Sequence, residues 1–290
     1  MAESGLIIVD KPAEWTSHDV VARMRRIAGT RRVGHAGTLD PMATGVLVIG
    51  VEKATRLLGH LALTEKVYEA TMRLGVTTNT DDAEGEVTAT APAGHVTEAD
   101  VRRGVEALTG QIMQVPPQVS AIEVNGQRAY KRARAGEEVE LAARPLTVHD
   151  FDVTAVRVHD DVVDVDATIR CSSGTYIRAL ARDLGAAFGV GGHLTYLRRT
   201  RVGPYDVSMA KTLEELATEC SILPIGDAVT AAFPRRDVTA EEAKAVSHGG
   251  RLPALGLGDG PIGVFGPGDE LLALVEEVGK TAKPLAVFVG

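Results

Sequence analysis

The alternation of apolar and polar residues predicts a chain of short strands and helices. Unbroken apolar runs, typical of buried strands, occur at 6–9 and 46–49. Strict alternation over 67–74 predicts a strand with one buried face, on which Tyr68 lies. Further strands are expected at 146–156, 162–170 and 193–200. Apolar residues at helical spacing follow the candidate caps Thr16, Thr97 and Thr175, and a shorter helix is expected at 54–63.

One stretch, residues 34–45, breaks this pattern. It holds three glycines, a histidine, two threonines and an Asp-Pro step, so we expect a loop here and not a regular helix or a central strand. Since the apolar run 46–49 follows at once, the strand would hold Asp40 in place beside a backbone that approaches a ligand closely. From local chemistry alone, Asp40–Pro41 is explained more simply as the start of a turn.

Length and composition bound the class of protein. The 290 residues, 44% of them hydrophobic, suggest a large domain plus a small one, or two domains. Cys171 and Cys220 are the only cysteines and have neither metal-ligand nor disulfide spacing, which fits a reducing compartment. No leader peptide precedes the first strand and no apolar run reaches 18 residues, so we expect a soluble, cytoplasmic protein without membrane contact.

The charge is unevenly distributed along the chain. A net charge of −8 argues against a general nucleic-acid binder. However, residues 11–56 carry eight Lys/Arg against four Asp/Glu, and residues 170–202 carry six against one. Segments 73–110 and 149–168 are acidic instead. This distribution is compatible with an RNA footprint on one face. The arginines at 23–32 form either a solvated helix face or a set of phosphate contacts.

Gly-His-Ala-Gly-Thr-Leu-Asp-Pro-Met-Ala-Thr-Gly at 34–45 resembles the signature loop of the TruB-type tRNA pseudouridine-55 synthases. Lys11-Pro12, Glu65-Lys-Val-Tyr68 and Ser-Ser-Gly-Thr-Tyr-Ile-Arg at 172–178 resemble further motifs of that family, in the same order. The resemblance extends from about Leu6 to about Gly203 and then weakens.

The resemblance implies an α+β fold of the pseudouridine synthase type, with a mixed, mainly antiparallel sheet flanked by helices. It implies a catalytic domain over 1–230, with a thumb-like insertion at about 122–145 that carries Tyr130 and, within 128–134, four basic residues. An ordinary surface excursion is the alternative for that insertion. From about Pro234 glycine becomes dense and short strands recur, so residues 231–290 are expected to form a small β-barrel that resembles a PUA domain.

The resemblance also assigns roles to single residues. Asp40 would be the catalytic nucleophile and Arg178 its ion-pair partner. Tyr68 would either stack on the target base only or also act as a general base. Taken alone, the alternation over 67–74 makes Tyr68 a core residue. Substrate-binding roles would fall on Lys11, Arg32, His35, Tyr176 and Leu197.

The implied activity is the isomerisation of uridine 55 in the T-loop of tRNA to pseudouridine by base flipping, without a metal or organic cofactor. The expected partner is the T-arm stem-loop, bound by a monomer. The acids at 81–84 match no calcium loop and are interpreted as structural. An RNA-guided synthase is disfavoured, because such enzymes lack the thumb and have a larger, more basic C-terminal barrel. A tRNA-folding chaperone that binds the tRNA elbow is the alternative from another class.

Overall fold

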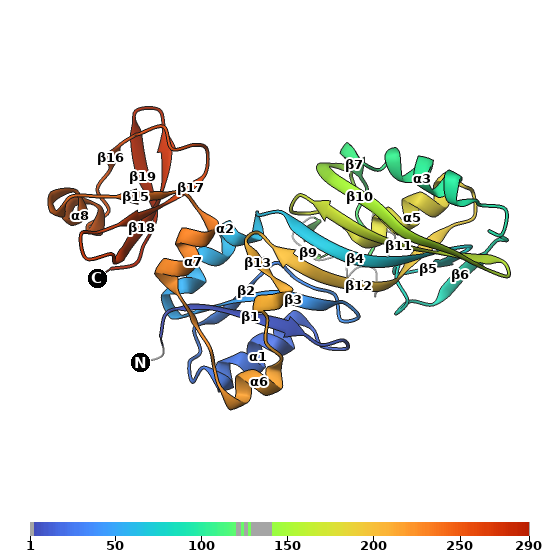
Figure 1. The fold of residues 1–290 in the computed structure, drawn as a ribbon, viewed down its shortest axis with the longest axis horizontal. Coiled ribbons are helices and arrows are strands. Elements are labelled where there is room, and N and C mark those ends of the chain that lie inside the picture. Colours follow the sequence, from blue (N-terminus) through green and yellow to red (C-terminus); the bar gives the residue numbers. More distant parts are fainter. Residues whose placement is uncertain (1–2, 120–122, 125–126, 129–140, 290) are drawn as a thin grey trace. The chain divides into compact units, whose positions relative to one another are not determined.

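The computed structural model describes residues 3–119, 123–124, 127–128 and 141–289 (Figure 1). The chain divides into two compact units, which we describe separately. Unit 1 comprises 1–40, 46–62 and 202–290, and unit 2 comprises 41–45 and 63–201. The expected domain boundary at residue 230 stays a prediction.

The N-terminal part of unit 1 contains the strands that lead to Asp40. Its elements are β1 (Gly5–Lys11), α1 (Ser17–Ile27), β2 (Val33–Ala36), β3 (Thr44–Val51), the 3-10 helix η1 (Glu52–Leu57) and α2 (Leu58–Ala62). The predicted strands at 6–9 and 46–49 are confirmed as β1 and β3, which are neighbours in one sheet. Helix α1 begins as predicted. The Thr16 hydroxyl accepts a hydrogen bond from the Asp19 amide, and the Asp19 carboxylate accepts one from the Thr16 amide.

The prediction of a loop over all of 34–45 was wrong at its start. Gly34–Ala36 belong to β2, which pairs antiparallel with β3 so that His35 lies opposite Ile49. Glycine suits this strand because a Cβ at Gly34 would lie 2.9 Å from Leu58 Cδ1. A side chain at this position would require the Leu58 side chain to move. The loop therefore begins only at Gly37.

The rest of unit 1 lies after residue 202. It contains β13 (Tyr205–Asp206), the 3-10 helix η2 (Val207–Met209), α6 (Leu213–Thr218), β14 (Leu223–Pro224) and α7 (Ile225–Ala232). It ends with β15 (Arg235–Asp237), α8 (Ala240–Ser247), β16 (Leu252–Pro253), β17 (Pro261–Phe265), β18 (Leu271–Val278) and β19 (Thr281–Val287). The last five strands form a curled sheet in the order β15-β17-β18-β19-β16, consistent with a PUA-like domain (Figure 1).

Residues near the C-terminus complete the core beneath the first strands. Phe265, Leu274 and Phe288 share one hydrophobic cluster with Leu6 of β1 and Val46 of β3. The cluster buries Phe288 to 4% exposure. A second, smaller cluster lies within the C-terminal segment.

Two polar contacts hold the end of the chain against the residues after β3. The Lys53 ammonium donates to the Phe288 carbonyl at 2.6 Å, and the Arg56 guanidinium donates to the Val287 carbonyl. The C-terminal segment is therefore packed as part of unit 1.

Unit 2 is built on an antiparallel sheet. Its elements are β4 (Lys66–Leu74), β5 (Val76–Thr78), β6 (Val87–Thr90), α3 (Glu98–Glu106), β7 (Gly110–Gln114), β8 (Glu123–Val124), β9 (Gln127–Arg128), β10 (Arg144–His159), β11 (Val162–Cys171), α5 (Ile177–Ala187) and β12 (Gly192–Val202). The sheet order is β12-β4-β11-β10-β7, and α3 and α5 pack against it and against each other (Figure 1). The predicted alternation in β4 is confirmed, because every second side chain from Lys66 to Leu74 is buried.

The expected thumb falls mostly outside the described residues. Tyr130 and the basic residues at 131–134 are among those on which nothing is described. Within the described residues, β8 and β9 pair antiparallel and β10 begins at Arg144. In the part of the chain that the structure describes, no helix is both long enough and apolar enough to span a bilayer.

Candidate active site

Asp40 is held by the first turn of α1. It is half-buried and follows Leu39, whose amide donates to the Ser17 hydroxyl at 2.9 Å. The same hydroxyl donates to the Leu39 carbonyl at 3.1 Å, and Ser17 is fully buried. One side chain therefore fixes both polar groups of the residue before Asp40. The role of Ser17 in holding Leu39 is not apparent from the sequence, because Ser17 is indistinguishable there from any other residue in a helix cap.

Lys11 shapes the turn that leads into α1. Its side chain is buried, and its ammonium donates to the carbonyls of Pro12 at 2.8 Å and Trp15 at 2.6 Å. Both contacts order the backbone before Ser17, so Lys11 supports the loop that carries Asp40. A direct contact of Lys11 with substrate stays a prediction.

His35 and Arg32 lie in the same segment but in different surroundings. The half-buried His35 ring packs edge-on against His18 of α1, with 5.8 Å between the ring centroids. Arg32 is exposed, and its guanidinium lies 3.7 Å from the Glu52 carboxylate. The substrate-binding roles of both residues stay predictions.

In unit 2, Tyr68 and Leu197 lie on neighbouring strands. Tyr68, on the buried face of β4, is 7% exposed, and Leu197 of β12 is 5% exposed. Lys66 lies two residues before Tyr68 on the same face, and its ammonium donates to the Thr64 carbonyl at 2.7 Å. Burial, and then the nearby Arg199 guanidinium, lower the Lys66 pKa to about 8. This face therefore combines an aromatic ring with cations removed from water.

The end of the Asp40 loop is fixed to β12. Thr44 and Gly45 pair with Arg198 and Arg199, and a Cβ at Gly45 would lie only 2.2 Å from the Arg199 carbonyl oxygen. Gly45 also has φ +98°, which disfavours other residues. Because no side chain fits here, the third glycine of the motif is required by this pairing.

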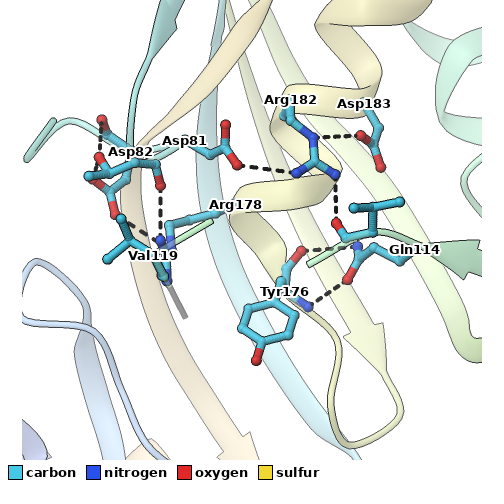
Figure 2. Close-up of polar contacts among 10 residues, drawn as sticks. Asp81, Asp82, Gln114, Val119, Tyr176, Arg178, Arg182 and Asp183 are labelled. Atoms are coloured by element: carbon cyan, nitrogen blue, oxygen red, sulfur yellow. Dashed lines mark hydrogen bonds and ion pairs between the residues drawn. The ribbon is translucent and has the colours of Figure 1, made fainter. Parts of the chain in front are cut away.

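Arg178 is held rigidly in unit 2. Figure 2 shows its guanidinium beside Val119 and Asp82. It donates to the Thr80 carbonyl at 2.9 Å and the Val119 carbonyl at 3.1 Å, and its Nε lies 3.5 Å from the Asp82 carboxylate. Both side chains of this ion pair are almost completely buried. Asp40 belongs to the other unit, so its pairing with Arg178 stays a prediction.

The polar turn at 77–85 supplies the partners of α5. Asp82 accepts from the Thr80 hydroxyl at 2.6 Å and from the Glu84 amide at 3.1 Å, so its carboxylate is oriented before it meets Arg178. Asp81 lies 3.3 Å from Arg182, one helical turn further along α5 (Figure 2). Burial raises the Asp81 pKa, and Arg182 opposes this shift. These acids, which the sequence indicated to be structural, contact the two arginines of α5. The sequence pattern did not connect the arginines to this turn.

The start of α5 differs from the expectation. Thr175 was expected to cap the helix, but the cap residue is Tyr176, and the Thr175 hydroxyl donates to the Ser172 carbonyl instead. The cap residue makes no side-chain cap hydrogen bond, but the Gln114 side chain holds its backbone. Gln114 donates to the Tyr176 carbonyl at 3.1 Å and accepts from the Tyr176 amide at 2.9 Å. Figure 2 shows the Tyr176 ring extending away from Gln114. A distant strand thus orients Tyr176 at the strand-to-helix turn.

The described part of the chain contains no cluster of metal-ligating side chains. There, no three His, Cys, Asp or Glu side chains converge in a way that could hold an ion. Cys171 is buried, and its burial raises the thiol pKa to about 11, which disfavours the reactive thiolate.

Comparison with known proteins assigns the family. Residues 25–177 match the model of the TruB family pseudouridylate synthase N-terminal domain. Residues 178–224 match the tRNA pseudouridylate synthase B C-terminal domain, and residues 233–289 match the C-terminal model of tRNA pseudouridine synthase II.

Similar proteins cover the whole chain. The chain is 65% identical to tRNA pseudouridine synthase B of Thermobifida fusca (strain YX), over 99% of both chains. It is 61% identical to the protein of that name from Streptomyces coelicolor, over 98% of this chain and 97% of the other.

Solved structures confirm the expected fold. The chain matches a protein in the structure of an H/ACA RNP bound to a substrate RNA containing 2′-deoxyuridine, with TM-score 0.74, 26% identity, and coverage of 99% of this chain and 85% of that one. It also matches a chain of a Cbf5-Nop10-Gar1 complex, with TM-score 0.73, 29% identity, and coverage of 99% and 84%. This protein therefore belongs to the TruB family of tRNA pseudouridine synthases, isomerases that convert uridine in tRNA to pseudouridine.

Proposed function

We propose that this enzyme isomerises uridine 55 in the T-loop of tRNA to pseudouridine, with Asp40 as the nucleophile. The observation that carries the proposal is the loop at 37–43, which presents Asp40 directly after the Ser17–Leu39 clasp. The full-length similarity to proteins named tRNA pseudouridine synthase B supports tRNA as the substrate.

The reaction conserves all atoms of the nucleotide. The N1–C1′ bond breaks, the uracil turns, and a C5–C1′ bond forms, while C5 loses a proton and N1 gains one. No electron is transferred and no group enters, so the isomerisation needs no cofactor. Because the base must turn freely, it has to leave the stack and enter a pocket closed to water.

Each proposed site residue has a task in this scheme. Ionised Asp40 provides the nucleophilic carboxylate, and Arg178, preset by Asp82, favours its charged form when the two meet. The Tyr68 ring stacks on the uracil, and its hydroxyl accepts or donates the proton in transfer. Leu197 and Tyr176 line the uracil pocket.

RNA outside the pocket is held by the N-terminal segment. His35 and Arg32 would contact the nucleotides around the extruded base, and Lys11 would support them from beneath. We expect a T-arm stem-loop to be a sufficient substrate without a guide RNA, because these residues all serve one flipped loop base.

The substitution Asp40→Asn tests the nucleophile. Asparagine is nearly isosteric and tolerates the same loop, but it has no ionised oxygen. We expect the Kd for a T-arm stem-loop to stay within about twofold of the parent, while turnover falls by about a thousandfold or more. Filter binding and pseudouridine yield would be measured on the same preparation, with Asp160→Asn at an exposed turn as the matched control.

Three outcomes separate the alternatives. Intact binding with no product supports Asp40 as the nucleophile. Retained turnover would exclude that role, and loss of binding together with turnover would mean that Asp40 only shapes the loop. Product at a position other than 55 in full-length tRNA would refute the proposed site of modification.

A further inference from the structure

Helix α1 and the turn after it carry exposed arginines that the proposed chemistry does not use. These are Arg23, Arg25, Arg26 and Arg31. Within the described residues none of the four forms an ion pair with a carboxylate, whereas their neighbour Arg32 lies 3.7 Å from Glu52. Four cations this close together repel one another, so an anionic partner would relieve their repulsion. Three of them lie at or just beyond the C-terminal end of α1, where the helix dipole favours positive charge even without a partner.

These arginines border a groove whose lining indicates the kind of partner. The groove has a volume of about 720 Å³ and is lined by Ala22, Arg25, Arg26, Gly29, Thr30 and Arg31. Its lining includes neither an acidic nor an aromatic side chain. Single-stranded RNA is usually bound by stacking its bases on aromatic rings, whereas double-helical RNA is recognised mainly through its backbone. A groove with only cations and small residues therefore suits duplex phosphates.

A neighbouring groove, which shares Ala22 and Arg26 with the first, suits RNA less well. It has a volume of about 470 Å³, and it contains Arg23 and Arg26 together with Trp15. However, three carboxylates line it as well, from Glu14, Asp19 and Glu214. These acids would repel a phosphate backbone, so we assign the RNA to the first groove.

The same helix fixes the distance from this groove to the reacting nucleotide. Its first residue, Ser17, clasps Leu39 next to Asp40, and its last residue, Ile27, precedes the groove residues Gly29 and Arg31. The groove residues Arg25 and Arg26 lie eight and nine residue steps from Ser17, which at about 1.5 Å each is about 12–13.5 Å along the helix axis. Because α1 is packed through Val20, Val21 and Met24, this distance is rigid.

We propose that the groove formed by Arg25, Arg26 and Arg31 binds the phosphate backbone of a double-helical RNA stem, about 12–13.5 Å along α1 from the Ser17 that clasps Leu39 beside Asp40. The inference rests on the proposed function, because it assumes that the reacting base lies at Asp40. Helix α1 then acts as a spacer that admits a loop uridine only when a stem lies at the correct distance. The surface would select stem-loops over unpaired RNA by backbone contacts alone.

The test compares two triple variants that lose the same charge. Arg25→Gln, Arg26→Gln and Arg31→Gln are combined in the full chain. The control combines Lys244→Gln, Arg251→Gln and Lys280→Gln, three exposed cations of the C-terminal segment. Binding of a T-arm stem-loop and of an unpaired loop oligonucleotide would be measured over a range of salt concentrations, and turnover at saturating stem-loop.

We expect the groove variant to bind the stem-loop roughly ten- to a hundredfold more weakly than the parent. The slope of log K against log salt should fall by about 2 to 3, because about one counterion is released for each phosphate neutralised. Turnover at saturation should stay within twofold, and affinity for the unpaired oligonucleotide should fall less than that for the stem-loop, because a single strand releases fewer counterions per phosphate neutralised. Arg25→Lys, Arg26→Lys and Arg31→Lys together should restore most of the binding, since a point charge suffices for phosphate.

Several results would overturn the inference. An unchanged salt slope, an equal loss in the control variant, or an equal loss for the unpaired oligonucleotide would each exclude stem recognition by this groove. If the lysine variant also fails to bind, the arginines have a structural role instead. If the parent enzyme makes no pseudouridine in tRNA, the proposed function fails. If the parent is active and the groove variant binds normally, only this inference fails.

Discussion

Arg178→Lys separates the contacts that hold this side chain from its proposed role in catalysis. The guanidinium reaches the Thr80 carbonyl, the Val119 carbonyl and the Asp82 carboxylate in three directions. A lysine ammonium keeps the charge opposite Asp82 but cannot reproduce the planar fork.

The loss of stability follows from these contacts. Two hydrogen bonds from a charged donor would be lost, each contributing about 1.5–3 kcal/mol, so we expect a destabilisation of about 3 kcal/mol. In a chain of this size about 1 kcal/mol lowers Tm by about 2–4 °C, which gives a fall of about 6–12 °C. Turnover on a T-arm stem-loop should fall by far more than the fraction of unfolded enzyme explains.

Arg182→Lys is the matched control on the same helix. Arg182 contacts Asp81, Asp183 and the Val115 carbonyl, but its side chain is 26% exposed and has no proposed role in the reaction. We expect a smaller fall in Tm and normal turnover. The turnover of each variant would be measured below its unfolding temperature. Near-parental turnover in Arg178→Lys, or an equal loss in both variants, would refute the placement of Arg178 in the active site.

Three further predictions concern other parts of the molecule. Tyr68→Phe should keep the parental Tm, because the ring stays on the buried face, and should lose most turnover if the hydroxyl transfers a proton; rates within about twofold would leave Tyr68 as a stacking residue only. Phe288→Ala should destabilise unit 1 by about 3–5 kcal/mol and reduce hydrogen-exchange protection in β1 and β3, whereas Leu255→Ala, at a site 59% exposed, should change the free energy of unfolding by less than about 0.5 kcal/mol. Lys66 has a pKa of about 8 in the folded protein against an ordinary lysine value of 10.5, so the unfolded state binds more protons between these values and stability should rise with pH there. Chemical denaturation at pH 7.5 and 10 should show this rise in the parent and a smaller one in Lys66→Met; identical pH profiles would contradict the burial of the ammonium.

Helix caps, strand alternation and apolar runs could be predicted from the sequence, because they depend on neighbouring residues. The Thr16 cap, the alternation in β4 and the run that became β3 follow from side-chain spacing, because the helix and strand periods are local properties. The motif at 34–45 identified the family, because its glycines and its Asp-Pro step suit the backbone of the β2–β3 connection and of the two strand ends beside it. From the sequence, the two acids at 81 and 82 were interpreted as structural, but the arginines that they contact were not identified.

Contacts between groups that are distant in sequence could be seen only in the folded chain. The Asp82 partner of Arg178, the Gln114 partner of Tyr176 and the Ser17 clasp on Leu39 all join different elements, and nothing in the local pattern selects one polar side chain over another. The Thr175 cap failed for a related reason, because the Thr175 hydroxyl donates to the Ser172 carbonyl and a glutamine on a separate strand holds the Tyr176 backbone before the helix. The same holds for Phe288, which completes a core begun at Leu6, because burial depends on the path of the whole chain and not on the residues beside it.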